Sequence, residues 1–414
     1  MNLMIEMIKY EWKKIWTSRL TQLSVIGCSM FLIFCVYSSI IQMTSTDTNG
    51  EKFSGLDAIE VLKDTQKRID LTQEMVDKLV RQYLKYTINP ITSSNNESYQ
   101  YLTEEIYKTF YLPNRDLLSL ITNVYREPGS GSSMRDVLEE NVGKNFIEAR
   151  LRRDKSYIQI KEKLGQLKAG EAKYWNDKID NLTEYQFGYH EGWSMILDTL
   201  TWPVLIMMII CIGIAPIFAG EYQSKCDSLI LCMKYGKSKL VMAKVIAAWI
   251  YTTCVYWGIT LTYSVVYIVL LGPEGADLPI QLKYPAMSVG YLLSMAEAAI
   301  YALIIAYVFT VGIMGVTLLM SALLKNTYGV IIISFLLIIV PTFLAPDAGG
   351  YIWSRVLSLL PPKIADFSFQ SYTAYSVGNI VLDWPTTAII VNMVMAILFS
   401  IASYIVFRKH QVNK

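Results

Sequence analysis

The feature that most limits how this chain can fold is a series of long apolar runs that carry almost no charge. A helix needs about 20 apolar residues to cross the ~30 Å hydrocarbon core of a bilayer. With 53% hydrophobic and 17% charged residues, the chain is also too apolar for an ordinary soluble protein. We therefore predict an all-α membrane protein with six transmembrane helices. The predicted spans are residues 20–43, 195–219, 245–271, 298–324, 328–345 and 386–407.

The positions of the basic residues predict the orientation of these spans. The apolar block 287–324 is long enough for two spans, but a second span there would place Arg408 and Lys409 outside. Loop Lys and Arg residues gather on the cytoplasmic side, so one span in this block, with both termini and the loop 220–244 in the cytoplasm, fits better. The remaining predicted segments are a cytoplasmic amphipathic helix at 1–19, an outer loop with an interfacial segment at 272–297, an outer loop with short apolar helices at 346–385 and a cytoplasmic tail at 408–414.

Residues 44–194 differ from the rest of the chain because they are charged and polar throughout. Apolar residues recur at helical spacing in 56–86 and in 137–167, and about 150 residues are enough to bury a core. We predict an extracellular helical domain between the first and second spans. Two roles stay open for it: it handles cargo or binds an outer partner, or it braces a dimer of subunits.

No motif in the sequence indicates catalysis or metal binding. The six cysteines lie in apolar runs or in the loop 220–244, without metal-ligand spacing to His190 or His410. The triplet 236–238 resembles the end of a phosphate loop, but leucine stands at position 231 where that loop needs glycine. We predict no enzyme activity, and no cofactor or metal bound by this chain. The net charge of +2 gives no reason to expect nucleic acid as a partner.

The charged loop 220–244 is the most informative short stretch. Apolar residues at steps of three and four predict a short amphipathic helix at the membrane face. Glu221 would lie in its first turn, where the helix dipole favours a carboxylate, and Gly236 would end it. The apolar stripe consists of Tyr222, Cys226, Leu229, Ile230 and Met233.

This layout resembles the ABC-2 type exporter permeases (type V fold), in which the second span ends in an acidic residue that opens a cytoplasmic coupling helix. In that family a basic turn follows, and a lysine opens the third span. The residues that fill these places are Glu221, Lys237, Lys239 and Lys244. The chain departs from the family pattern at Lys225, where glycine is common, and at Lys234, where proline is common. An ordinary basic loop would explain the lysines, but not the order of acid, stripe and turn.

The resemblance implies the transmembrane subunit of a bacterial ABC exporter in the plasma membrane, with a Gram-positive host expected. Two separate ATPase subunits would hold ATP and Mg²⁺, and a second permease subunit, identical or related, would complete the path. The implied ATPase-coupling residues are Glu221, Tyr222, Leu229, Ile230, Met233, Lys237, Lys239 and Lys244. The implied cargo is amphipathic, such as an antimicrobial peptide, a drug or a lipid. The alternative is a non-transporting membrane receptor or sensor with a helical ectodomain.

Two further groups of residues near the spans are candidates for function. Small residues repeat every four positions on the fourth span and allow close helix packing, within one subunit or between two. They are Ser294, Ala298, Ala302 and Ala306. Acids near the outer ends of the second, fourth and sixth spans would favour a cationic cargo along the path, or would instead cap their helices. They are Asp198, Glu297 and Asp383.

Overall fold

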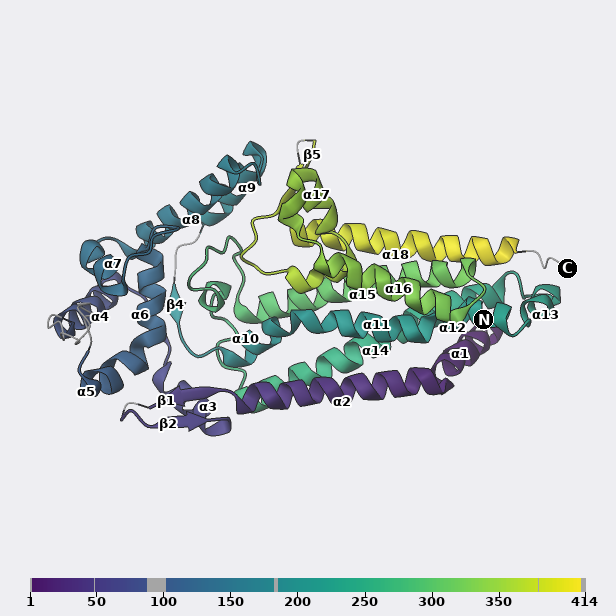
Figure 1. Ribbon diagram of the computed structural model, residues 1–414, viewed down its shortest axis with the longest axis horizontal. Coiled ribbons are helices and arrows are strands. Elements are labelled where there is room, and N and C mark those ends of the chain that lie inside the picture. The colour runs from purple at the N-terminus through teal and green to yellow at the C-terminus, as the bar shows by residue number, and fades with distance from the viewer. Residues whose placement is uncertain (1, 48, 88–101, 182–184, 379, 411–414) are drawn as a thin grey trace.

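The computed structural model describes residues 2–47, 49–87, 102–181, 185–378 and 380–410, and helices dominate them (Figure 1). Among these residues, five helical segments are long and apolar enough to cross a membrane. The chain is therefore a mostly helical protein of the multi-pass membrane type. The five segments are α2 (Arg19–Ile41), the run Glu191–Gln223, α14 (Lys239–Leu271), α15 (Met295–Leu323) and α18 (Trp384–Lys409).

The predicted fifth span, 328–345, corresponds to a shorter apolar helix, α16 (Thr327–Phe343). Its 17 residues make it about 25 Å long at 1.5 Å per residue, a little less than the ~30 Å bilayer core. The run Glu191–Gln223 contains four consecutive helical pieces. They are α10 (Glu191–Asp198), η2 (Thr199–Thr201), α11 (Trp202–Ile214) and α12 (Pro216–Gln223).

Helix α15 lies at the centre of the bundle. Its most apolar window is 72% buried, whereas that of α2 is only 17% buried. It packs closely along α18, because a side chain on Gly315 would come within 2.9 Å of Ala396 Cα. Ala298, Ala302 and Ala306 are buried on the same helix, so these small residues lie in the interior of a single chain.

The residues between α2 and α10 form a helical domain, here called the insert, at one end of the bundle (Figure 1). Capping side chains begin several of its helices: for example, Thr72 accepts from Met75 N before α4 (Gln73–Tyr86), and Asn145 accepts from Glu148 N before α8 (Phe146–Lys163). The other helices of the insert are α3 (Leu56–Thr65), α5 (Glu104–Ile106), η1 (Tyr107–Tyr111), α6 (Leu112–Tyr125), α7 (Met134–Asn141) and α9 (Ala169–Ile179).

Short antiparallel strands are the main departure from the predicted all-helical insert. Strand β1 (Thr44–Thr46) pairs with β2 (Lys52–Ser54), and β3 (Ile69–Asp70) pairs with β4 (Gln186–Phe187). Strand β3 divides the segment 56–86, whose apolar spacing predicts helix, into α3 and α4. Because β4 directly precedes α10, the β3–β4 pair fastens the insert where the chain returns to the bundle.

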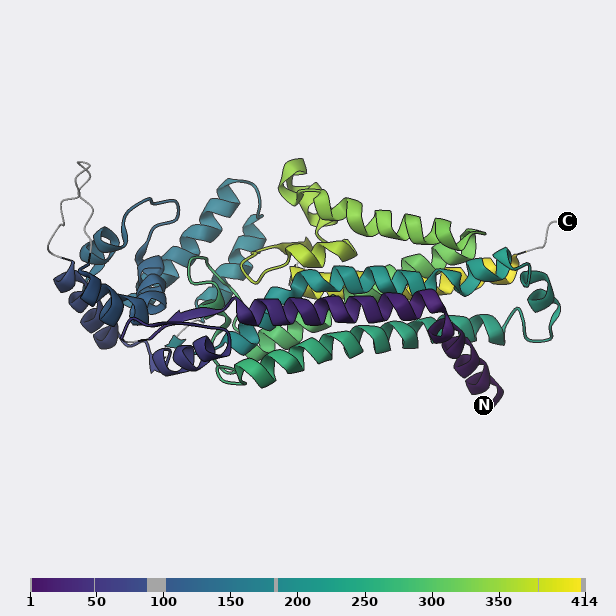
Figure 2. The same cartoon turned by 60° about the horizontal axis from the view of Figure 1, so that its bottom comes forward.

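The two chain ends lie at the end of the bundle opposite to the insert (Figures 1 and 2). Helix α1 (Asn2–Thr17) meets α2 at a bend and packs against α14. The short helix α13 (Asp227–Cys232) lies at this same end. We call it the terminal end, and the other the insert end.

Two connecting segments lie at the insert end of the bundle. The first joins α14 to α15 and contains the 3-10 turn η3 (Ile280–Lys283). The second joins α16 to α18 and contains an amphipathic helix, α17, with an exposed apolar face. The elements of the second segment are η4 (Pro346–Gly349), α17 (Gly350–Leu357), η5 (Pro361–Asp366) and the hairpin β5 (Ala374–Val377) and β6 (Ile380–Asp383).

Candidate functional site

A cluster of four charged side chains, of which Lys14 is exposed and the other three are buried, joins three helices at the terminal end. Lys244 Nζ on α14 lies 2.6 Å from Glu221 Oε1 on α12 and 2.8 Å from Glu11 Oε2 on α1. Lys14 Nζ on α1 approaches Glu221 Oε1 at 2.6 Å. Lys244 is 1% exposed, and Glu11 and Glu221 are each 5% exposed. The cluster thus ties α1 to the end of α12 and to the N-terminal part of α14.

The cluster is balanced, with two carboxylates and two ammonium groups. Moving an ion out of water costs several kcal/mol, and close pairing is what offsets that cost. Burial lowers the pKa of Lys14, but its hydrogen bond and charge interaction with Glu221 outweigh this and hold the pKa above its ordinary value. Each acid in the cluster thus has an ammonium group within salt-bridge distance, and removing one member leaves another with fewer partners.

The structure corrects the predicted position of Glu221. The sequence places this residue in the first turn of the coupling helix, but it lies in the last turn of α12 with its side chain buried. Lys225 adopts a left-handed backbone (φ 56°) that separates α12 from α13. The predicted single helix is therefore two shorter ones, and the second begins at Asp227.

Gly236 does not end the short helix, because α13 ends at Cys232. A side chain on Gly236 would overlap the carbonyl oxygen of Ile230, so glycine is required for a close backbone contact. The turn after α13 therefore folds back tightly on the helix.

The predicted ATPase-coupling residues divide into an inward group and an outward group. Besides Glu221 and Lys244, Ile230 is buried, and Tyr222 is half-buried and donates to Ala322 O at 3.0 Å. In contrast, Leu229 is 70% exposed and Met233 is 52% exposed. The exposed group, here called the α13 surface, consists of Leu229, Met233, Lys237 and Lys239.

Three partners of these residues are missed by sequence reasoning. Glu11 and Lys14 belong to a helix whose basic residues suggest only a membrane-surface role, yet both enter the charge cluster. His410 lies 3.2 Å from Asp227 Oδ2 and stacks near Tyr222. Glu11 is one of two acids on this helix, with Glu6, so its charge alone did not single it out.

The three acids predicted near the outer ends of the spans each bond to a partner of their own. Asp198 pairs with Lys283. Glu297 Oε2 accepts from the backbone of Ser294, whose hydroxyl accepts in return, so the two form a capping box. Asp383 caps α18 and accepts from Lys178 Nζ at 3.2 Å. Glu297 and Asp383 therefore cap their helices, whereas Asp198 makes no capping hydrogen bond and pairs with a lysine instead.

The insert is bonded to the connecting segments rather than held only by its two chain crossings. Arg153 on α8 donates to Met287 O at 3.0 Å and to Pro285 O at 3.3 Å, with Asp154 fully buried beside it. Trp175 on α9 is fully buried, with its ring centroid 5.1 Å from that of Tyr291. The sequence predicts a domain that folds on its own, but its core is continuous with the bundle.

A hollow with polar lining lies where the insert meets the spans. Two adjoining cavities of about 540 Å³ and 410 Å³ share lining residues, and the second reaches Met43 and Ser194 at the ends of α2 and α10. Gln66 donates to Asp116 at 3.0 Å, while its buried Oε1 has no hydrogen-bond partner among the described residues. The shared lining residues are Thr44, Leu62, Gln66, Arg115 and Asp116.

Comparison with known proteins gives one result. A family model described as "Protein of unknown function (DUF2705)" matches residues 175–412. No curated protein and no solved structure matches the chain. The matched part begins at Trp175, the residue that packs α9 against the connecting segments, and includes Glu221, Lys244 and Asp383. Glu11, Lys14 and most of the insert lie outside it.

Proposed function

We propose that this chain, which belongs to the DUF2705 family of proteins of unknown function, is the transmembrane subunit of an ABC-2 type exporter in a bacterial plasma membrane. It has six spans in this proposal, with α16 as the fifth, and both termini are cytoplasmic. The chain itself does not hydrolyse ATP. A separate pair of ATPase subunits binds ATP and Mg²⁺ and docks at the terminal end.

The observation that carries the proposal is the charge cluster directly beside the exposed α13 surface. Leu229 and Met233 offer apolar anchors to a partner, and Lys237 and Lys239 offer charge. A partner that pushes on α13 acts on α12, because only Lys225 and its neighbours separate the two helices. The cluster then passes the displacement to α1 and α14. Such coupling requires that nucleotide and cargo each favour one of two arrangements of these helices.

The distribution of basic residues supports the orientation. Lys225, Lys234, Lys237 and Lys239 lie around α13, and Arg408 and Lys409 end α18 at the same end of the bundle. Loop lysines and arginines mark the cytoplasmic side. The insert is then extracellular.

The hollow at the insert end supports an export path that opens beside the insert. Its lining combines apolar side chains such as Leu62 and Phe187 with charged ones such as Arg115, Asp116 and Glu191. A mixed lining of this kind suits an amphipathic cargo, such as an antimicrobial peptide, a drug or a lipid. The insert then receives the cargo as it leaves the spans. A second permease subunit completes the path.

A receptor or sensor without transport activity is the second candidate. The firm bonding of the insert to the connecting segments favours it, because a ligand bound in the hollow would act on the spans through Arg153 and Trp175. This function needs no ATPase at the α13 surface. The two proposals therefore differ in what binds the terminal end.

The experiment that separates them is affinity purification of the full chain from its native membranes, with a search for an ATPase and assay of ATP hydrolysis. The variant is Leu229→Asp, and the matched control is Leu56→Asp, at an exposed leucine of the insert (53% exposed, against 70% for Leu229). The proposal predicts that the wild type and the Leu56→Asp variant retain an ATPase and that the Leu229→Asp variant loses it. Failure to recover any ATPase with the wild type would favour the receptor.

A further inference from the structure

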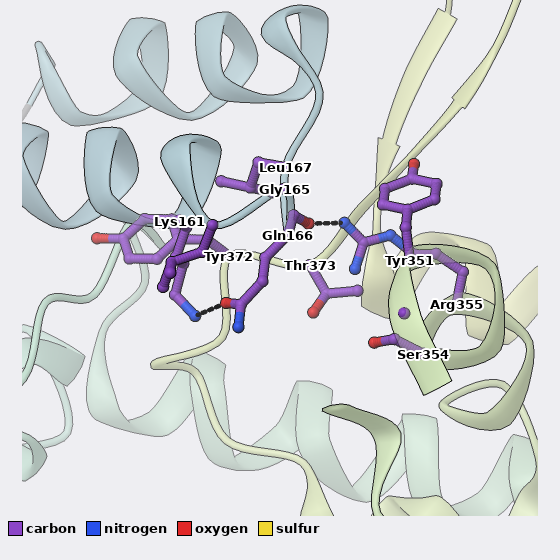
Figure 3. Close-up of a pocket in the computed structure, with 11 residues that line it drawn as sticks. Lys161, Gly165, Gln166, Leu167, Tyr351, Ser354, Arg355, Tyr372 and Thr373 are labelled. Atoms are coloured by element: carbon purple, nitrogen blue, oxygen red, sulfur yellow. Dashed lines mark hydrogen bonds between the residues drawn. The ribbon is translucent and has the colours of Figure 1, made fainter. Parts of the chain in front are cut away.

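A small cavity of about 200 Å³ lies between the end of α8 and the α17 helix (Figure 3). One wall comes from residues 161–167 of the insert, and the other comes from residues 350–355 and 372–373 of the connecting segment. It is separate from the larger hollow, with which it shares no lining residue. Two parts of the chain far apart in sequence therefore build it together.

The lining of this cavity carries two cationic side chains. Lys161 and Arg355 supply positive charge, and among the described lining residues none is acidic. Figure 3 shows Gln166 between the two cations: its backbone oxygen accepts from Arg355 Nη2 at 2.8 Å, and its Oε1 accepts from Lys161 Nζ at 3.4 Å. Ser354 and Thr373 add hydroxyl groups to the lining, whereas the hydroxyls of Tyr351 and Tyr372 bond to Glu171 and Ser288.

Arg355 has donor capacity that the described residues do not use. It is 8% exposed, and its Nη2 donates to Gln166 O and to Glu171 Oε2, while its buried Nε has no hydrogen-bond partner among them. A buried N–H of this kind is costly when left unpaired. Glu171 pairs with Arg355, and Lys168 Nζ lies 4.6 Å from the Tyr351 ring centroid. The cavity is therefore lined by two cationic side chains, Lys161 and Arg355, with a third, Lys168, beside Tyr351.

We propose that this cavity binds a single phosphate group, carried by an anionic phospholipid headgroup or free as inorganic phosphate. Guanidinium and ammonium groups with nearby hydroxyls are the donors that phosphate oxygens accept from. The cavity volume suits one such group rather than a whole peptide or nucleotide.

The position of α17 makes a lipid accessible to this site. Ile352 is 77% exposed and Val356 is 60% exposed, on the face of α17 that does not contact the insert. An amphipathic helix with an exposed apolar face lies in the interfacial region of a bilayer, where headgroup phosphates are found. Binding of a phospholipid requires that α17 lies in the bilayer interface, whereas binding of free phosphate does not. Neither kind of binding depends on an ATPase partner.

Binding of three probes to the purified full chain in detergent tests the site. The probes are short-chain phosphatidylglycerol, short-chain phosphatidylcholine and inorganic phosphate. The variant is Lys161→Glu, at a half-buried position that lines the cavity, and the matched control is Lys163→Glu, at an exposed position on the same helix. A further variant, Arg355→Lys, keeps the charge that faces Glu171 but removes the Nε donor.

If the ligand is a lipid, the wild-type protein should bind phosphatidylglycerol more tightly than phosphatidylcholine. If the ligand is the free anion, it should bind inorganic phosphate. Lys161→Glu should weaken that binding at least tenfold, which corresponds to about 1.4 kcal/mol, and Lys163→Glu should leave it unchanged. Arg355→Lys should weaken it by a smaller factor. Equal binding by the Lys161→Glu and Lys163→Glu variants would overturn the proposal, as would a wild type that binds neither phosphatidylglycerol nor phosphate.

Discussion

The two ends of this molecule hold their helices together in different ways. At the terminal end, four charged side chains from α1, α12 and α14 meet in one cluster, and three of them are buried. At the insert end, separate contacts tie the insert to the connecting segments: Arg153 to backbone carbonyls, and Trp175 to aromatic rings. In a single cluster the positions of the helices depend on one another, because its members share partners. Distributed contacts instead hold a surface in place.

Lys244→Met should have the largest effect on stability, because it leaves Glu11 and one side of Glu221 without their buried ammonium group. We expect a loss of about 3–5 kcal/mol, the range for breaking a buried pair from one side. The measurement is the melting midpoint of the purified protein in detergent. The control is Lys239→Met, an exposed lysine in the first turn of the same helix, with an effect of about 0.5 kcal/mol or less.

A second substitution sharpens this test. Glu11→Gln removes one of the two carboxylates that Lys244 compensates, so the Lys244→Met and Glu11→Gln double variant should be destabilised by less than the sum of the two single variants. Additive losses, or a Lys244→Met variant as stable as Lys239→Met, would contradict a coupled cluster.

Arg153→Met should have an intermediate effect, because several neighbouring contacts remain at the insert end. The change removes hydrogen bonds to Pro285 O and Met287 O and leaves Asp154 with Arg150, so we expect about 2 kcal/mol. Hydrogen exchange should rise at residues 285–291 and stay unchanged at α12 and α1. Arg152→Met, at an exposed position of the same helix, is the control. Loosening of α12 in the Arg153→Met variant would show that the two ends are not separate.

Asp383→Asn should have the smallest effect. Asparagine still caps α18, so the change removes mainly the charge that faces Lys178. Burial lowers the pKa of Lys178, while Tyr174 and Asp383 raise it above its ordinary value, so the variant should lower that pKa and cost about 1 kcal/mol or less. Thermal melting is the readout. A loss as large as that of Arg153→Met would mean that the Lys178 contact is a main attachment of the insert.

The long apolar helices could be predicted from sequence because an apolar run of sufficient length has few alternatives to a membrane helix. The start of α14 at Lys239 could not be predicted in this way, because the helix begins with charged residues that precede the apolar run. The strands of the insert are two or three residues long, too short for an alternating pattern to show.

The candidate site was predicted in part. Glu221 and Lys244 stood out from the sequence, but spacing along one segment cannot show that both side chains turn inward to meet α1. The contact of Trp175 with Tyr291 joins residues that are far apart in sequence, so no local pattern indicated it. Tertiary packing decided which side of α13 was exposed.

The most direct test of the proposed coupling is photo-crosslinking in native membranes. A benzoylphenylalanine placed at position 229 on α13, or at position 56 on the insert, forms an adduct with whatever lies against it. The account predicts an adduct with an ATPase subunit at position 229, with a yield that changes when ATP is added, and none at position 56. An ATPase that co-purifies with the chain but forms no adduct at position 229, or forms one only at position 56, would contradict it.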